Sequence, residues 1–266
     1  MRCIPFDRYI DCFHILEKYS EEYPFMLRHF LDTTARHFPE GFSLLDIGAG
    51  TGLFARAFLS KSPVPVRSYT AIEPSPDHVR TLFENLRNLP VETTIIPDYF
   101  TPETRTGKKY DIVLLSHSTY CFLPDPEPYL LHALSLLEDD GRAVFYQGCP
   151  TNFCTFLNLL YRDVLPEERV TDPLFTSWDV RDILEKKQVP HAVTYLPGSL
   201  RAGEIFLPEN EQLFNDLITF SFMVEADSLP PGMLARSKEI LQEIAYPSAN
   251  GPLLNLGVDA IVTGLA

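Results

Sequence analysis

Five short apolar runs alternate with segments of helical length between residues 42 and 148. Such runs, bounded by glycine, proline and aspartate, are typical of parallel strands joined by crossover helices. The expected strands cover residues 42–48, 68–74, 92–98, 111–118 and 142–148. Helices are predicted at 52–60, 77–88 and 126–138, with Gly141 as the stop after the last one. The pattern therefore indicates an open α/β sheet with helices on both faces.

The pattern changes on both sides of this region. Residues 6–38 predict one or two helices, with Pro24 as a break. The segments after the fifth strand predict helical or irregular insertions at 151–172 and 208–247, a capped helix at 176–187, and two late strands at 191–198 and 253–264.

Together these elements predict a single domain over residues 1–266, built on a Rossmann-like, mostly parallel sheet of seven strands. We expect a helical N-terminal cap over residues 1–40 and the ligand-binding core over residues 41–150. Residues 151–266 would supply the last strands, together with helical insertions before and after the sixth strand.

The composition argues against several classes of function. The chain carries 22 basic and 36 acidic residues, a net charge of −14, and a surface of that sign repels nucleic acids. No stretch approaches the roughly 18 apolar residues of a membrane span, and the first residues lack the pattern of a signal peptide. The five cysteines are odd in number and scattered, which predicts reduced thiols in a cytoplasmic protein and no metal site.

Residues 44–52, LLDIGAGTG, place three glycines between a buried strand and a helix. Glycines permit positive φ and let a ligand approach the backbone closely. A dinucleotide-binding turn has the spacing Gly-x-Gly-x-x-Gly and would need glycine at position 53, where Leu53 stands. Asp46 would also place a negative charge beside a pyrophosphate. A nicotinamide cofactor is therefore disfavoured, and a tight turn without any ligand is the simpler alternative.

This segment resembles motif I of the class I S-adenosylmethionine-dependent methyltransferases. The resemblance implies S-adenosylmethionine as the cofactor, with Asp46, Gly48 and Gly50 beside its amino acid and ribose. It also implies that Glu73, at the end of the second strand, accepts hydrogen bonds from both ribose hydroxyls. A carboxylate suits that role because it offers two acceptor oxygens to neighbouring hydroxyls.

The next two strand ends complete the cofactor site that the resemblance implies. Asp98, at the end of the third strand, corresponds to the family position near the adenine amino group; the contact is made either by Asp98 itself or by Tyr99 and Phe100 stacking beside the base. Ser116 and His117 end the fourth strand, which in this family lines the cofactor and faces the methyl group that is transferred. A turn residue is the alternative for Asp98, and a structural histidine is the alternative for His117.

Segments outside the central motif resemble the histamine N-methyltransferase-like group of this family. IEPSPDH implies that His78 lies beside the cofactor, and STYCFLPDP implies that Tyr120 lies on the substrate side. The group's substrate-binding glutamate falls on Glu22 of the N-terminal helical stretch. Its substrate-binding asparagine falls in the closing strand at Leu256, one residue from Asn255.

Two departures from that group affect the acceptor rather than the methyl transfer. The group's glutamine at the fourth-strand exit is His117 in this chain. Asn255 replaces the group's asparagine only if the strand register shifts, because neighbouring strand residues face opposite sides. The resemblance therefore implies methyl transfer without specifying histamine as the acceptor.

We expect the chain to methylate a small molecule at an amine or imidazole nitrogen. O- or C-methylation of a phenol, a carboxylate or a polyketide-like metabolite is one alternative, and a non-catalytic binding module is another. His117 either accepts a proton from the acceptor or only lines the pocket. Glu22 is expected to bind a cationic substrate, although its acidic run with Glu17 and Glu21 also fits a solvated helix face.

Overall fold

The computed structural model describes residues 1–264, which form two compact units. The helical unit comprises residues 1–22, 148–178 and 196–258, and the sheet unit comprises residues 23–147 and 179–195 together with the chain from residue 259. That the whole chain forms one methyltransferase domain stays a prediction. Within the described range, no helix combines the length and the apolar character that crossing a membrane requires.

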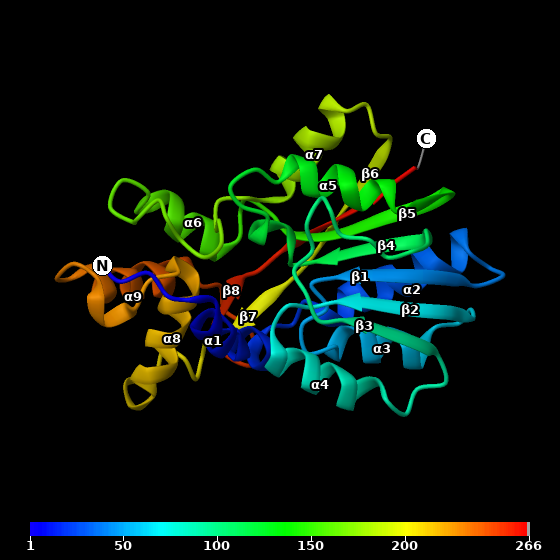
Figure 1. Ribbon diagram of the computed structural model, residues 1–266. Helices are drawn as coiled ribbons and strands as arrows, with labels where there is room; N and C mark the ends of the chain where they lie inside the picture. The colour runs from blue at the N-terminus through cyan, green and yellow to red at the C-terminus, as the bar shows by residue number, and fades with distance from the viewer. Residues whose placement is uncertain (265–266) are drawn as a thin grey trace. The chain divides into compact units, whose positions relative to one another are not determined.

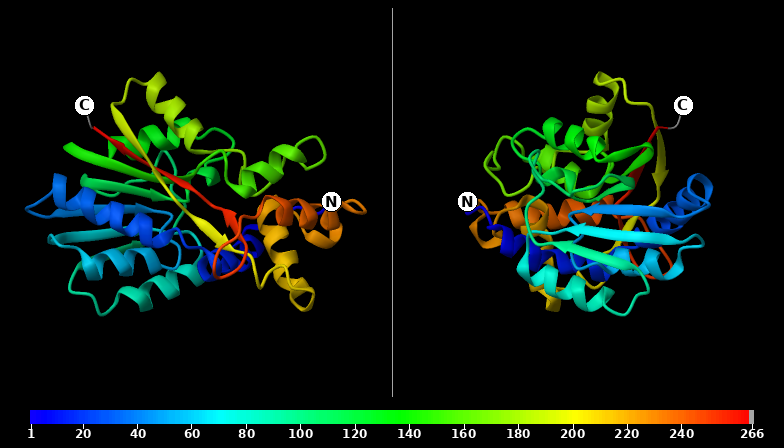
Figure 2. Two further views of the ribbon diagram at one scale, coloured as in Figure 1. Left: turned by 180° about the vertical axis from the view of Figure 1, so that it is seen from behind. Right: turned by 45° about the vertical axis from the view of Figure 1, so that its right-hand side comes forward.

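The sheet unit contains a seven-stranded sheet with the order β3-β2-β1-β4-β5-β9-β6. Strands β3, β2, β1, β4 and β5 pair in parallel (Figure 1), and Figure 2 shows β9 and β6 from behind. The strands are β1 (Phe42–Ile47), β2 (Val66–Ile72), β3 (Glu92–Ile96), β4 (Tyr110–Ser116), β5 (Leu137–Gly148), β6 (His191–Leu196) and β9 (Val258–Thr263). The predicted seven-stranded, mostly parallel Rossmann-like sheet is confirmed.

The helices of the sheet unit alternate with its strands as the apolar pattern predicts. They are α2 (Tyr23–His37), α3 (Leu53–Lys61), α4 (Pro76–Leu86), α5 (Glu127–Ser135), most of α7 (Ser177–Lys186) and the 3₁₀ turn η1 (Thr119–Cys121). A cluster of aromatic rings packs α2 and α3 against the sheet. The Phe30 and Phe58 ring centroids lie 4.8 Å apart, and Phe58 lies 6.1 Å from Tyr69 of β2. This cluster is the apolar support beneath the carboxyl ends of β1 and β2.

The strand order of the sheet reverses between β1 and β4. β1 pairs with β2 on one side and with β4 on the other, so that Asp46 lies opposite both Ala71 and Leu114. All three strands are parallel, and their carboxyl ends therefore meet at one edge of the sheet. In open α/β folds, ligands bind at this point, where the strand order reverses.

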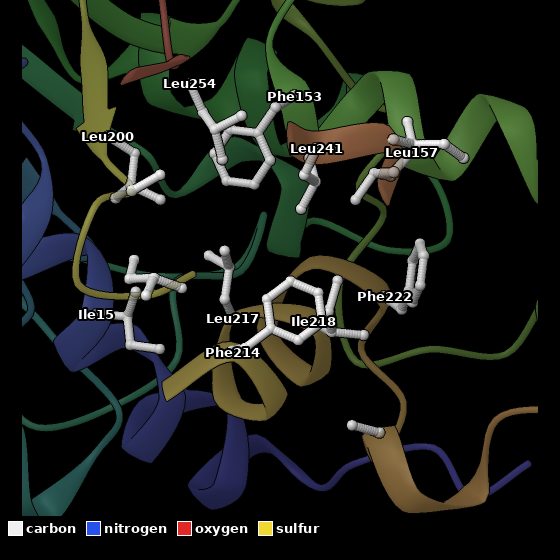
Figure 3. Close-up of a cluster of buried hydrophobic side chains, with 14 of the residues drawn as sticks. Ile15, Phe153, Leu157, Leu200, Phe214, Leu217, Ile218, Phe222, Leu241 and Leu254 are labelled. Atoms are coloured by element: carbon white, nitrogen blue, oxygen red, sulfur yellow. The ribbon is translucent and has the colours of Figure 1, made fainter. Parts of the chain in front are cut away.

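The helical unit has a separate hydrophobic core. Its elements are α1 (Phe6–Tyr19), α6 (Phe153–Leu160), α8 (Glu211–Phe222), α9 (Met233–Ile244), the 3₁₀ turns η2 (Pro208–Asn210) and η3 (Ala226–Ser228), and an antiparallel pair of β7 (Ser199–Arg201) and β8 (Leu253–Asn255). Figure 3 shows side chains of α8 facing Phe153 and Leu157 of α6 and Leu241 of α9. The core is continuous because α8 is buried along almost its whole length.

Three boundaries differ from those that the pattern predicts. Pro24 does not separate two helices but lies in the first turn of α2, where its missing N–H leaves no helical bond unmade. The helix expected to reach residue 138 ends at Ser135, and Gly141 lies inside β5, which begins at Leu137. The single strand expected at 253–264 is two strands, β8 and β9, which belong to different sheets.

Candidate functional site

The three glycines after β1 adopt the left-handed backbone conformation that glycine tolerates best. Gly48, Gly50 and Gly52 have φ of 77°, 56° and 74°, values at which an L-residue is strained. The N–H groups of Gly48 and Ala49 donate to the Ile72 carbonyl at 2.9 and 3.3 Å, so the turn is tied to the end of β2. The predicted strand-turn-helix geometry is therefore present, with α3 beginning at Leu53.

The space around these glycines differs from one to the next. A Cβ on Gly48 would lie 2.6 Å from the Cβ of Ser118, and one on Gly52 would collide with Leu82. A Cβ on Gly50 would meet no atom of the described chain within 4 Å. Gly48 and Gly52 are thus required by packing, whereas Gly50 leaves the backbone accessible to a ligand.

Glu73 follows β2 directly and holds the glycine turn through its side chain. The residue is 4% exposed. Its Oε2 accepts the Gly50 N–H at 2.8 Å, and its Oε1 accepts the Ser75 N–H at 3.0 Å. Hydrogen bonds to a charged acceptor are about twice as strong as neutral ones. One carboxylate therefore connects the turn after β1 with the turn before α4.

His78 lies beside Glu73 in the first turn of α4. Its Nδ1 is 3.5 Å from Oε1 of Glu73, and its backbone N–H donates to the hydroxyl of the N-cap residue Ser75 at 3.3 Å. The cap fixes the start of α4 and thereby the place of the imidazole. The structure thus brings Gly48, Gly50, Glu73 and His78 together at the ends of β1 and β2.

Asp46 is buried in β1 and its carboxyl group accepts a hydrogen bond from another strand. The hydroxyl of Tyr69 donates to Oδ2 at 2.7 Å. Burial is the main cause that raises the pKa of Asp46 to about 7; the Tyr69 hydrogen bond opposes this shift, and the nearby negative charge of Glu73 adds to it. Asp46 lies two residues before Gly48, and its carboxyl group is therefore protonated in mildly acidic solution.

The residues predicted to surround adenine lie after the end of β3. Asp98 is exposed and its Oδ1 accepts the Tyr99 N–H at 2.8 Å. The Tyr99 ring is 61% exposed. Phe100 is instead buried and stacks on His132, with ring centroids 5.4 Å apart. Asp98 and Tyr99 are accessible for a base, whereas Phe100 serves the packing of α5.

The residues predicted at the end of β4 form a short, strained exit. Ser116 is the last residue of the strand and pairs with Tyr146 of β5. His117 has a φ of 52°, and its backbone N–H donates to the Tyr146 carbonyl at 2.9 Å. Tyr120 follows in η1 and is half-buried. Positive φ is uncommon for residues other than glycine and occurs often at active sites.

The two substrate residues predicted outside the sheet belong to the helical unit. Glu22 is 4% exposed, and its Cβ lies 3.0 Å from where a Cβ on Gly198 would stand. Asn255 is half-buried, its Nδ2 donates to the Thr151 carbonyl at 2.8 Å, and its Oδ1 accepts the Gly257 N–H at 3.1 Å. Both amide ends of Asn255 therefore engage the loops of the helical unit. Substrate binding by Glu22 and Asn255 stays a prediction.

Two side chains at the site escaped the sequence analysis. Tyr69 resembles any apolar strand residue until its hydroxyl is seen to reach Asp46. Ser118 lies two residues beyond β4, and its place against Gly48 follows from the bend at His117. The apolar pattern of the strands predicts neither contact. The Tyr69–Asp46 contact depends on a tyrosine rotamer, and the Ser118–Gly48 contact depends on the positive φ of His117.

The groups at this edge fit the cofactor that motif I implies. Gly50 leaves open space above the backbone, and the adjacent Glu73 is a buried carboxylate with acceptor capacity beyond its two backbone hydrogen bonds. A diol needs such an acceptor, and the missing Cβ permits close approach. Gly48, Gly50, Glu73 and His78 would therefore hold the ribose and the atoms next to it.

The raised pKa of Asp46 predicts a pH-dependent stability. The folded protein keeps a proton on Asp46 up to about pH 7, whereas the unfolded chain releases it near pH 4. The contribution of this carboxyl group to stability is therefore complete below pH 4, falls as the pH rises, and is constant above pH 7. We expect Asp46→Asn to match wild type near pH 4 and to exceed it by about 2–4 kcal/mol at pH 8.

Urea denaturation at a series of pH values measures this difference in the free energy of unfolding. Asp77→Asn is the matched control, because Asp77 lies on α4 with 77% of its side chain exposed. A difference between Asp46→Asn and wild type that does not change from pH 4 to pH 8 would contradict the assignment.

Comparison with known proteins identifies the family. A family model described as a methyltransferase domain matches residues 16–186. The malonyl-[acyl-carrier protein] O-methyltransferase 1 of Ilyobacter polytropus is 28% identical over 134 residues, which are 50% of this chain and 44% of that protein. The chain therefore matches less than half the length of this relative.

Solved structures share the fold at low sequence identity. A methyltransferase structure from Bacillus halodurans C-125, BH2331, has a TM-score of 0.56 at 14% identity, covering 88% of this chain and 96% of that chain. The plantazolicin methyltransferase BpumL, solved in complex with SAH, has a TM-score of 0.53 at 15% identity, covering 97% and 90%. Since the family model spans more than half of its residues, the chain belongs to the methyltransferase-domain family, a class of S-adenosylmethionine-dependent enzymes.

Proposed function

We propose that this chain transfers the methyl group of S-adenosylmethionine to an amine or imidazole nitrogen of a small molecule. The observation that carries the choice of acceptor is the buried carboxylate of Glu22. A carboxylate removed from water favours a cationic partner strongly, because burial weakens its solvation and strengthens its attraction to a positive charge. The net charge of −14 also favours a cationic acceptor.

Cys154 of the helical unit interacts electrostatically with Glu22. Burial raises the pKa of the Cys154 thiol to about 12, and the carboxylate of Glu22 contributes to this increase. A thiol in this environment stays protonated and is a poor nucleophile. Glu22 thus gives its surroundings the polarity that would recruit an ammonium or imidazolium group.

The chemistry of the reaction sets the tasks of the remaining residues. When bound, S-adenosylmethionine supplies a methyl group on a positively charged sulfur, which departs as a neutral thioether. The chain has to hold the acceptor nitrogen in line with the methyl carbon and to exclude water. An amine that binds as its cation must also lose a proton, since a protonated nitrogen has no lone pair for attack.

His117 is the residue that we propose as the proton acceptor. It lies directly after β4, at the edge of the sheet where the glycine turn ends β1. The bond from its N–H to the Tyr146 carbonyl holds the backbone at a strained φ. Such strain persists where the surrounding structure fixes it, which is frequent at active sites. In the proposed reaction, the imidazole takes the proton of the bound ammonium group, and the lone pair that this step frees then attacks the methyl carbon.

Methylation of a carboxylate oxygen is the second candidate. It is favoured by the relative from Ilyobacter polytropus, which is an O-methyltransferase of malonyl-[acyl-carrier protein]. A carboxylate needs no proton acceptor, so His117 would only line the site in that reaction. The acidic surface of this chain repels an anionic acceptor, and for this reason we place the amine first.

Replacement of Glu73 tests the cofactor assignment. Glu73→Ala should weaken binding of S-adenosylhomocysteine by about 2 kcal/mol or more, because the ribose hydroxyls and the Gly50 N–H lose a charged acceptor. Glu73→Gln should weaken it less, since an amide keeps one acceptor oxygen. Isothermal titration calorimetry measures both, with the exposed Glu84→Gln of α4 as control. Folded variants that bind as wild type does would refute the ribose assignment.

Replacement of Glu22 tests the acceptor class. Glu22→Gln should raise the KM of a cationic amine about tenfold and leave that of a neutral phenol nearly unchanged, because only the cation loses its counter-charge. The measurement is methyl transfer from labelled cofactor to a panel of amines, phenols and carboxylic acids. Glu21→Gln is the neighbouring control, since that carboxylate already contacts Ser199 and Arg201. Activity confined to acids, with no effect at Glu22, would establish O-methylation instead.

Replacement of His117 tests the proton acceptor. His117→Ala should lower kcat for a cationic amine about 10²-fold or more and change its KM little, because the proton is removed from the amine after it has bound. The loss should be greatest below neutral pH, where more of the amine is protonated. Rates of amine methylation between pH 6 and pH 9 measure this dependence. An equal loss at all pH values would show that His117 only lines the site.

A further inference from the structure

Ser118 places a buried hydroxyl beside the glycine turn of the sheet unit. The residue is 8% exposed, and its Oγ has no hydrogen-bond partner among residues 1–264. Its Cβ stands where a Cβ on Gly48 would collide with it. A buried hydroxyl without a partner is unfavourable, and folded proteins contain few of them. The unsatisfied hydroxyl therefore indicates a hydrogen-bond partner other than residues 1–264 of the chain.

The position of Ser118 is fixed by its neighbours on both sides. His117 precedes it in the strained backbone tied to β5, and the Ser118 carbonyl accepts the Cys121 N–H at 3.1 Å in the η1 turn. Thr119, the next residue, donates its hydroxyl to Oε1 of Gln147 at 2.5 Å. The hydroxyl of Ser118 is therefore held at the carboxyl ends of β1 and β4, next to the first glycine of the turn.

We propose that Ser118 Oγ hydrogen-bonds the amino-acid end of bound S-adenosylmethionine, an inference that rests on the cofactor binding proposed above. The order of the strands indicates which end of the cofactor lies near Ser118. Asp98 lies after β3, Glu73 after β2 and Ser118 after β4, so adenine at β3 and ribose at β2 direct the rest of the molecule across β1 toward β4. The carboxylate and ammonium groups at that end both pair with a hydroxyl, which donates as well as accepts.

The strand order also explains why this residue is small. Gly48 and Ser118 approach so closely that the turn has no room for a Cβ on the glycine. A larger residue at 118 would displace the turn, and an alanine would fit but could not bond. Serine thus combines close packing against Gly48 with one polar atom.

Ser118→Ala tests the proposal through binding rather than turnover. We expect about 5- to 10-fold weaker binding of S-adenosylhomocysteine. Binding of 5′-methylthioadenosine, which has the adenosine but no amino-acid group, should not change. The melting temperature of the ligand-free variant should rise by about 1–3 °C, because an unsatisfied hydroxyl is removed. Calorimetry with the two ligands and differential scanning fluorimetry of the free protein provide these values.

Ser237→Ala of α9 is the matched control. Its hydroxyl is also buried and has no partner within the described part of the chain, but it belongs to the helical unit. This variant should gain similar stability and bind both ligands as wild type does.

Each other outcome for Ser118→Ala overturns the proposal. Unchanged binding of S-adenosylhomocysteine would show that the hydroxyl does not contact the cofactor. Equal weakening of both ligands would place the contact at the adenosine end, and a lower melting temperature with weaker binding would show a packing role. A wild-type protein that binds neither ligand would refute the proposed function together with this inference, whereas failure in the variant alone leaves the function intact.

Discussion

The hydrogen bonds from the backbone N–H groups of Gly50 and Ser75 to the Glu73 carboxylate are the contacts on which the candidate site depends. They connect the turn after β1 to the turn before α4, and both turns otherwise have N–H groups without a partner in a regular element. A buried carboxylate is unfavourable without hydrogen-bond donors, and these N–H groups are unfavourable without an acceptor. The site is therefore shaped before a ligand arrives, which reduces the ordering that binding requires.

The aromatic core makes this arrangement rigid. Phe30 packs on Phe58, Phe58 packs on Tyr69, and the Tyr69 hydroxyl donates to Asp46, two residues before Gly48. Two buried acids so close together would repel each other if both were ionised. The proton that Asp46 keeps up to about pH 7 removes that repulsion, so the negative charge at this edge is concentrated on Glu73, where a diol would meet it.

Sequence predicted the features that follow from local periodicity and backbone constraints. Alternating apolar runs locate the strands, and the glycines at 48, 50 and 52 mark the turn because no other residue tolerates those φ values as well. The break between β8 and β9 was not predicted, since residues 253–264 read as one apolar strand. It depends on long-range pairing, in which β8 joins β7 and the Leu256 N–H donates to the Gly198 carbonyl.

The side chains divide in the same way. Glu73 was singled out because it ends the second strand, where the family that the glycine turn resembles has an acidic residue. Tyr69 and Ser118 were not, because a hydroxyl contact depends on how two distant segments meet. Gly141 led to a wrong helix boundary. A glycine after a helical pattern usually ends the helix, whereas here β5 already pairs with β4 from Leu137 onward.

The residues proposed for the cofactor and Glu22, proposed for the acceptor, belong to different units of the chain. The candidate cofactor edge of this chain uses backbone N–H groups, glycine conformations and one carboxylate. The family model ends at residue 186, before α8 and α9 and before Asn255. The segment beyond it builds much of the helical unit around a core of its own. The hydrogen bonds that hold the glycine turn and Glu73 are made within the sheet unit, so within the described chain this edge is formed without hydrogen bonds from the segment beyond the family model.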